Sequence, residues 1–207
     1  IIMGDMQHPD FLRARIDEVL DWKNLCLGAY PGAKKYTAAE ISEWLAEFGD
    51  RFKPYVCDVG AYLGLAAREG KNIMFEAQLG ALRDIDFGIY PYTSSSNTIA
   101  AYAPIGAGVP DLKLDRTIGI MKAYSSCVGE GPFTAEMFGD EAVRLREAGG
   151  EYGAATGRPR RVGGFDVVAS RYGCRVQGAD EIALTKLDVL DGFDRIPVVD
   201  PYQCSGV

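Results

Sequence analysis

The sequence predicts an α/β protein with a mainly parallel sheet flanked by helices, and a helical segment at its N-terminal end. Apolar residues recur at helical spacing through the first third of the chain, and short apolar strands alternate with helical stretches in the later part. That alternation is typical of a parallel sheet covered by helices. We therefore expect a helical segment over residues 1–70 and an α/β part over residues 71–207.

Local start and stop signals predict three helices in the first segment. Pro9 stands where a helix has its first turn, a position at which the missing N–H costs nothing. Thr37 and Glu40 have the spacing of a capping box, with an apolar stripe behind them. A third helix is predicted over residues 58–69, ended by Gly70.

The α/β part is predicted to open with a short buried strand over residues 72–77. Residues 80–96 follow, with neither helical nor strand period, and a long structured loop of this kind inside a domain is usually functional. The remaining expected elements are strands over residues 123–128, 181–184 and 195–199, and helices over residues 140–147 and 166–176.

Composition excludes several classes of function. The formal net charge is −7, whereas proteins that bind the nucleic-acid backbone need clustered positive charge. No apolar run reaches about 18 residues, so no membrane span is expected. The five cysteines are scattered without metal-binding spacing, which predicts reduced, mostly buried thiols in a cytoplasmic protein. Small anionic ligands stay open, because they need only a local basic pocket.

A Lys-x-Asp turn directly after a predicted strand is a candidate guanine site. In open α/β sheets, ligands bind at the carboxyl ends of strands. The carboxylate of Asp188 can accept two hydrogen bonds from the ring N–H and the exocyclic amine of guanine, while the Lys186 stem packs along the base. Adenine presents the opposite pattern on that edge. The alternative is a surface turn with an exposed lysine and a capping aspartate.

A loop rich in glycine and arginine, residues 153–161, is a candidate anion site. Glycines let backbone N–H groups approach an anion closely, and Thr156 offers a hydroxyl. Arg158, Arg160 and Arg161 supply forked donors for carboxylate or phosphate. The alternative is a solvated basic loop, but on an acidic protein three clustered arginines favour an anion site.

The irregular loop over residues 84–98 is a third candidate. Its row of hydroxyl and amide side chains can bind a phosphate or ribose, or can simply be a serine-rich connector. Asp84 and Asp86 are interpreted as braces of this loop rather than metal ligands. The only histidine, His8, precedes a helix start away from all three loops, so no nucleophile–histidine arrangement can be proposed.

Together these strings resemble the adenylosuccinate synthetase family, and their order and spacing match it. The resemblance is strongest between residues 75 and 192. It implies a fold related to the phosphate-loop nucleotide hydrolases. The markers are Phe75-Glu76, Asp84-Ile85-Asp86, Tyr90-Pro91-Tyr92, Ser95-Ser96-Asn97-Thr98, Lys122-Ala123-Tyr124-Ser125, Val128-Gly129, Gly131-Pro132-Phe133, Gly157-Arg158 and Thr185-Lys186-Leu187-Asp188-Val189-Leu190-Asp191-Gly192.

The resemblance implies a two-step ligation in purine (AMP) biosynthesis. GTP phosphorylates the 6-oxygen of IMP, and the amine of L-aspartate then displaces that phosphate, with help from Mg²⁺. Family members are usually homodimers. By matching position, the implied IMP contacts are Gln78, Ser94, Val128 and Arg158, the aspartate contacts are Ala155, Thr156, Arg158 and Arg160, and the GTP contacts are Arg160, Lys186, Leu187 and Asp188.

The sequence also departs from the family pattern. The family string Phe-Glu-Gly-Ala-Gln-Gly is replaced so that Leu79 stands in strict register with the IMP-contacting glutamine, and we expect a local shift that lets Gln78 serve. Ala155 stands where a second threonine is common, and Pro159 lies between the two key arginines.

Neither the Gly-Asp-Glu-Gly-Lys-Gly-Lys phosphate loop, with its catalytic aspartate, nor the Gly-Gly-His-Asn-Ala-Gly-His segment occurs in the sequence. We therefore expect the central to C-terminal portion of a longer enzyme, with no catalytic residue and no metal ligand of its own, inactive alone. Two alternatives stay open: a GTP-binding module, and a non-catalytic interaction domain.

Overall fold

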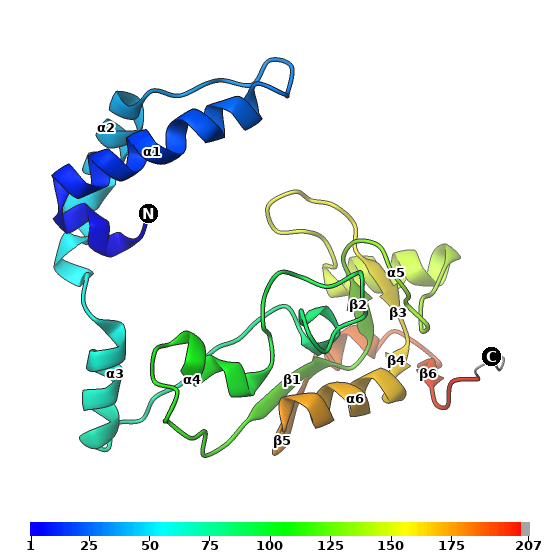
Figure 1. Cartoon of the computed structure of the whole chain (residues 1–207). Coiled ribbons are helices and arrows are strands. Elements are labelled where there is room, and N and C mark those ends of the chain that lie inside the picture. Colours follow the sequence, from blue (N-terminus) through cyan, green and yellow to red (C-terminus); the bar gives the residue numbers. More distant parts are fainter. Residues whose placement is uncertain (204–207) are drawn as a thin grey trace. The chain divides into compact units, whose positions relative to one another are not determined.

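The computed structural model describes residues 1–203 and divides into two compact units (Figure 1). Unit 1 comprises Ile1–Leu65, and unit 2 begins at Ala66, so the boundary falls inside helix α3 (Val59–Arg68). Among the described residues, no helix is both long and apolar enough to cross a membrane.

Unit 1 is helical, as predicted. Helices α1 (Pro9–Leu27) and α2 (Ala38–Phe52) pack against each other, with Ile16 and Leu45 buried. The capping box is present, because Glu40 N donates to Thr37 Oγ1 at 3.2 Å and Thr37 N donates to Glu40 Oε2 at 2.8 Å. Short 3₁₀ turns cover Met3–Gln7 and Lys53–Tyr55.

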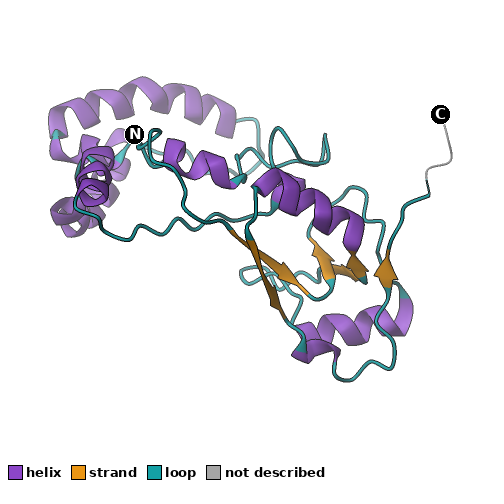
Figure 2. Cartoon of the chain, turned by 90° about the horizontal axis from the view of Figure 1, so that it is seen from below, coloured by secondary structure: helices purple, strands orange, loops and turns teal. Residues whose placement is uncertain are grey.

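Unit 2 is mixed α/β, but its strands form three two-stranded sheets within residues 1–203 (Figure 2). The expectation of a mainly parallel sheet is confirmed in part, because two of the three pairs are parallel, but among residues 1–203 the strands are short and no third strand joins any pair. The sheets are β1 (Ile118–Lys122) parallel to β5 (Glu181–Thr185), β2 (Ser125–Cys127) antiparallel to β3 (Arg161–Gly163), and β4 (Phe165–Asp166) parallel to β6 (Val198–Val199).

The β1–β5 sheet carries uncovered apolar residues on both faces. Ile120 pairs with Ala183 in register, and the next residue of β1, which points to the opposite face, pairs with Leu184. Ile120 is 71% exposed and Ile182, on the other face, is 53% exposed. Such strands are usually buried on both faces.

Helices α5 (Gly139–Gly149) and α6 (Val167–Gln177) of unit 2 each have a defined cap, and α5 supplies two residues of the core cluster. Helix α5 ends at Gly150 in the left-handed conformation. Helix α6 starts at Asp166, whose Oδ1 accepts a hydrogen bond from Ala169 N at 2.9 Å. The core cluster consists of Ala123, Tyr124, Ala142, Leu145, Val162, Val189 and Leu190.

Some expected elements are wrong or shorter. Residues 72–77 form no strand, and Met74 is 88% exposed, because no described strand lies beside them to share a hydrogen-bond ladder. The strands expected over residues 123–128 and 195–199 shrink to β2 and β6. The remaining elements are η3 (Ala81–Arg83), η4 (Ala100–Tyr102), α4 (Ala103–Gly106) and η5 (Asp188–Leu190).

The four cysteines in the described residues are free thiols. Cys127 and Cys174 are half-buried, but Cys26 and Cys57 are exposed, so burial was a wrong expectation for these two. Cys26 lies in the last turn of α1 and Cys57 lies between η2 (Lys53–Tyr55) and α3, both at the surface of unit 1. Cys204 lies outside the described residues.

Candidate functional site

The arginine loop, residues 151–161, forms a hairpin-like projection (yellow in Figure 1). Tyr152 and Pro159 pair across its base, and Gly153 N donates to Arg158 O at 2.8 Å. Gly157, with φ of 63°, turns the chain at a position where a side chain would be strained. The exposed part of the loop carries Ala155, Thr156 and Arg158.

A buried carboxylate holds the base of this loop. Glu151 is 1% exposed. Its Oε1 accepts from Lys122 Nζ and from Tyr124 OH, both at 2.6 Å, and its Oε2 accepts from Arg160 Nη1 at 3.1 Å. Arg160 N also donates to Glu151 O at 2.9 Å. The side chain of Arg160 is therefore fixed in direction while the rest of the loop projects outward.

Electrostatics keeps Glu151 ionised. Burial alone would raise the pKa of its carboxyl, but hydrogen bonds from Lys122 and Tyr124, with the charges of Lys122 and Arg160, hold the pKa below its usual value of 4.5. The pKa of Tyr124 is raised by burial and by its hydrogen bond to Glu151. Tyr124 thus stays a neutral donor to the carboxylate.

The predicted guanine turn begins where β5 ends. Lys186 has φ of 62°, which turns the chain sharply out of the strand, and its Nζ donates to Gly149 O at 3.0 Å. Leu187 is 55% exposed, and Asp188 is exposed at the start of η5. Lys186 and Arg160 are therefore both fastened to residues 149–151, at the end of α5.

The serine loop, residues 84–98, is organised from within by Asp84. This buried carboxylate accepts from the backbone N–H groups of Asp86, Phe87 and Thr98 at 2.9, 2.9 and 2.5 Å. Burial would raise the pKa of Asp84, but these hydrogen bonds hold it below its usual value. Asp86 accepts from Asn97 Nδ2 at 2.9 Å. Both acids brace the loop, as interpreted from the sequence.

Arg83 joins the serine loop to the segment that carries Val128. Its Nη1 donates to Tyr92 O at 2.5 Å, and its Nη2 donates to Val128 O at 2.9 Å. Its own carbonyl accepts from Ser94 N at 2.8 Å. Ser94 and Val128, both expected near IMP, are thus linked through one arginine. Sequence reasoning missed it, although a charged residue between Leu82 and Asp84 was a usable signal.

Gln78 is not joined to these clusters by any hydrogen bond among residues 1–203. It is exposed in an irregular segment, and Leu79 beside it has φ of 81°, a conformation that leucine rarely adopts. The segment therefore departs locally from ordinary backbone geometry at the position where the sequence departs from the family string.

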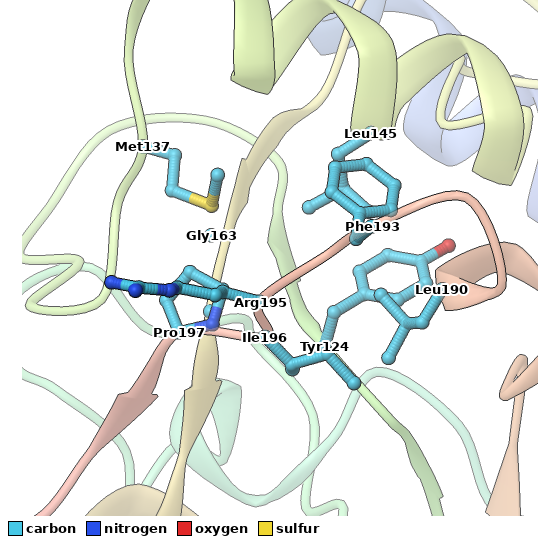
Figure 3. A pocket seen from close by; sticks show the side chains of 10 residues that line it. Tyr124, Met137, Leu145, Gly163, Leu190, Phe193, Arg195, Ile196 and Pro197 are labelled. Carbon is cyan, nitrogen blue, oxygen red and sulfur yellow. The ribbon is translucent and has the colours of Figure 1, made fainter.

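An apolar cavity beneath these loops belongs to the core rather than to the site (Figure 3). Tyr124, Leu145 and Leu190 line it and are also members of the core cluster. Within residues 1–203 no three His, Cys, Asp or Glu side chains gather as metal ligands.

Comparisons with known proteins identify the family of the sequence. The sequence matches the family model described as adenylosuccinate synthetase over residues 1–207. It is 42% identical over 206 residues to the adenylosuccinate synthetase of Parafrankia sp. (strain EAN1pec), covering 100% of this chain and 48% of the relative. It is 43% identical over 207 residues to that of Bifidobacterium animalis subsp. lactis, with the same coverage.

The fold also matches a solved structure, the fully ligated adenylosuccinate synthetase from Plasmodium falciparum. The TM-score is 0.82 at 31% sequence identity, covering 93% of this chain and 45% of that one. The chain spans about half the length of the curated relatives it matches. A family match over its whole length shows that this chain belongs to the adenylosuccinate synthetase family.

Proposed function

We propose that this chain supplies the ligand-binding half of an enzyme that ligates L-aspartate to IMP, converting GTP to GDP and phosphate, in the cytoplasmic synthesis of AMP. One observation carries the proposal. The Lys-x-Asp turn and the arginine loop are both fastened to residues 149–151, so one rigid support would hold a guanine nucleotide and an anionic substrate together. Phosphoryl transfer depends mainly on such positioning and on charge stabilisation.

Asp188 is proposed to select GTP over ATP. Its exposed carboxylate is free to accept the two N–H donors of the guanine edge, whereas adenine would place an acceptor against it. Lys186 and Leu187 flank the base. The Lys186 ammonium is fixed on Gly149, and the stem is proposed to lie along the flat ring.

The arginine loop is proposed to bind aspartate. Ala155 and Thr156 offer backbone and hydroxyl groups at the exposed part of the loop, and Arg158 reaches both aspartate and IMP. Arg160, held by Glu151, reaches aspartate and the nucleotide phosphates. Ser94 and Val128, linked by Arg83, complete the IMP contacts together with Gln78.

The reacting groups would come from outside this chain. In the first step the γ-phosphoryl group is transferred from GTP to the 6-oxygen of IMP. In the second step the aspartate amine bonds to carbon 6 of IMP as phosphate leaves. We propose that this chain carries no catalytic residue for either step and that Mg²⁺ is held elsewhere in a homodimeric enzyme. We expect negligible product from the 207-residue chain alone.

A chimera tests the proposal. The matching half of the Parafrankia synthetase would be replaced by this chain, and adenylosuccinate formation would be measured with IMP, aspartate and Mg²⁺, comparing GTP with ATP. Product with GTP and little with ATP is expected, and Asp188→Asn should weaken that preference. No product from a chimera that folds and binds IMP would overturn the proposal and favour a non-catalytic interaction domain. GTP binding without IMP-dependent phosphate release would favour a GTP-binding module.

A further inference from the structure

We infer that Glu151 is a positioning residue that couples the arginine loop to the guanine turn. The inference rests on the proposed function of these two segments. Glu151 is buried and lies outside the exposed parts of the arginine loop and of the guanine turn. It would therefore act through the residues to which it is hydrogen-bonded.

The first step is the fixing of Arg160. Three hydrogen bonds hold this residue: Nη1 donates to Glu151 Oε2, its N–H donates to Glu151 O, and its carbonyl accepts from Arg146 Nε at 2.8 Å. Its Nε is buried and has no partner within residues 1–203. An arginine held this way gives up little side-chain freedom when an anion binds, and a buried unpaired donor favours an acceptor from a ligand.

The second step is the link to the guanine turn. Lys122, which donates to Glu151 Oε1, is the last residue of β1 and pairs in register with Thr185, the last residue of β5. Ala123 N donates to Thr185 O at 2.9 Å, and Lys186 then reaches back to Gly149 O. Contacts therefore connect Glu151 with the ends of β1 and β5, and Lys186 connects the end of β5 with the end of α5.

The third step is charge. Lys122 and Arg160 both point at the one carboxylate of Glu151, with neutral Tyr124 as its third partner. Without the carboxylate charge, two cations would be left facing each other in a poorly solvated place. The least costly relaxation is for Arg160 to swing into solvent, which would loosen the loop and the strand ends together.

The first test measures backbone protection in the 207-residue chain by hydrogen–deuterium exchange. In Glu151→Gln, the backbone N–H groups of residues 152–160, Pro159 excepted, and of residues 185–188 should exchange about tenfold faster, the effect of losing one charged hydrogen bond. Glu147→Gln, the same charge change at an exposed position on α5, is the matched control and should leave both segments unchanged. Faster exchange in the arginine loop alone, or in neither segment, would overturn the coupling.

The charge-retaining variant Glu151→Asp guards against a trivial result. If Glu151→Gln also speeds exchange throughout α6, that variant has unfolded unit 2, and the coupling is then judged from Glu151→Asp. It should speed exchange in both segments while α6 stays protected. Acceleration confined to one segment contradicts the inference.

The second test uses kinetics in the chimera. Glu151→Gln should raise the KM values for aspartate and GTP about tenfold each while the KM for IMP rises by much less, because Arg158 is one of four proposed IMP contacts and the other three lie outside the loop. When Arg160→Lys is already present, adding Glu151→Gln should raise the KM values for aspartate and GTP little further. Equal changes in all three KM values would mark a merely structural role. If the unmutated chimera makes no product, the proposed function fails, and the exchange experiment still decides the inference.

Discussion

The two units are stabilised by different kinds of interaction. In unit 1 the buried side chains, such as Ile16 and Leu45, are apolar, and its ion pairs are exposed, as in Arg15–Glu18. Unit 2 also buries charged groups, Asp84, Glu151 and Asp166, each held by several hydrogen bonds. Helix caps and an apolar stripe suffice for the first arrangement.

The comparison teaches where to look for function. Burying a charge is unfavourable unless it is paired and hydrogen-bonded, and its benefit is often geometry rather than stability. Glu151 lies at the base of the arginine loop and Asp84 lies within the serine loop, both of which have predicted ligand contacts, whereas no buried charge is found in the described residues of unit 1. We therefore expect two of these buried charges to fix the shape of segments that bind ligands, whereas Asp166 caps α6.

The stabilities of the two units should differ most at acid pH. The pKa values of Glu151, Asp84 and Glu136, whose carboxylate pairs with Arg161, are all lowered in the folded chain. Each carboxylate therefore stabilises unit 2 above its usual pKa and loses that contribution as pH falls through the lowered value. Unit 2 should therefore unfold below about pH 4. Glu40 in unit 1 also has a lowered pKa, about 2, but it is fully exposed and contributes little.

The measurement can follow each unit separately. Both tryptophans, Trp22 and Trp44, lie in unit 1, so their fluorescence reports that unit alone. Cys127 and Cys174 are half-buried in unit 2. The extent to which a thiol reagent labels each of them, measured by peptide mapping, reports their exposure. Simultaneous loss of both signals on acidification would contradict the distinction.

Removing the buried carboxylate should give the largest effect of a single substitution. Glu151→Ala leaves Lys122 and Arg160 without their counter-charge, and unit 2 should lose about 3–5 kcal/mol of stability. Urea unfolding, detected by the labelling of Cys174, measures this loss. Tryptophan fluorescence should show that the stability of unit 1 is unchanged. A loss below about 1 kcal/mol would mean that the cluster is already hydrated.

Asp84→Asn should have a smaller effect on the same unit. The amide keeps the shape of the side chain but loses the charge that three backbone N–H groups share, at a cost of about 2 kcal/mol. Hydrogen exchange over residues 84–98 should rise locally. Unchanged protection in this loop would show that the carboxylate does not organise it.

Changes in unit 1 should be the smallest. Thr37→Ala removes the side-chain cap of α2 and should cost about 1 kcal/mol, visible in urea unfolding by tryptophan fluorescence. Arg15→Ala, which breaks an exposed pair, serves as the control and should change stability by less than about 0.5 kcal/mol. An equal effect of the two substitutions would contradict the importance of the cap.

Local signals predicted the helices correctly. Pro9, the Thr37–Glu40 box and Gly70 act within a few residues, so their meaning is contained in a short window. The strand expected over residues 72–77 failed because a strand is defined by its neighbour, which a local apolar run does not specify. For the same reason the sequence could not specify that the strands form separate pairs within residues 1–203.

The site shows the same division. The chemistry of Arg158, Arg160, Lys186 and Asp188 was visible in their side chains, and its binding role stays a prediction. Glu151 and Arg83 were missed, because their partners lie far away along the chain: 29 residues separate Lys122 from Glu151, and 45 separate Arg83 from Val128. Long-range pairings of this kind depend on the tertiary fold.

The β1–β5 sheet has a practical consequence for anyone who purifies the chain. Each of its strands has an outer edge with no third strand beside it in residues 1–203, and its isoleucines remain uncovered. Unpaired backbone groups beside apolar side chains are a template onto which another chain adds a strand. We expect the colloidal behaviour of the isolated chain to depend on its concentration, with aggregates that begin at this sheet and disperse when a complementary segment caps it.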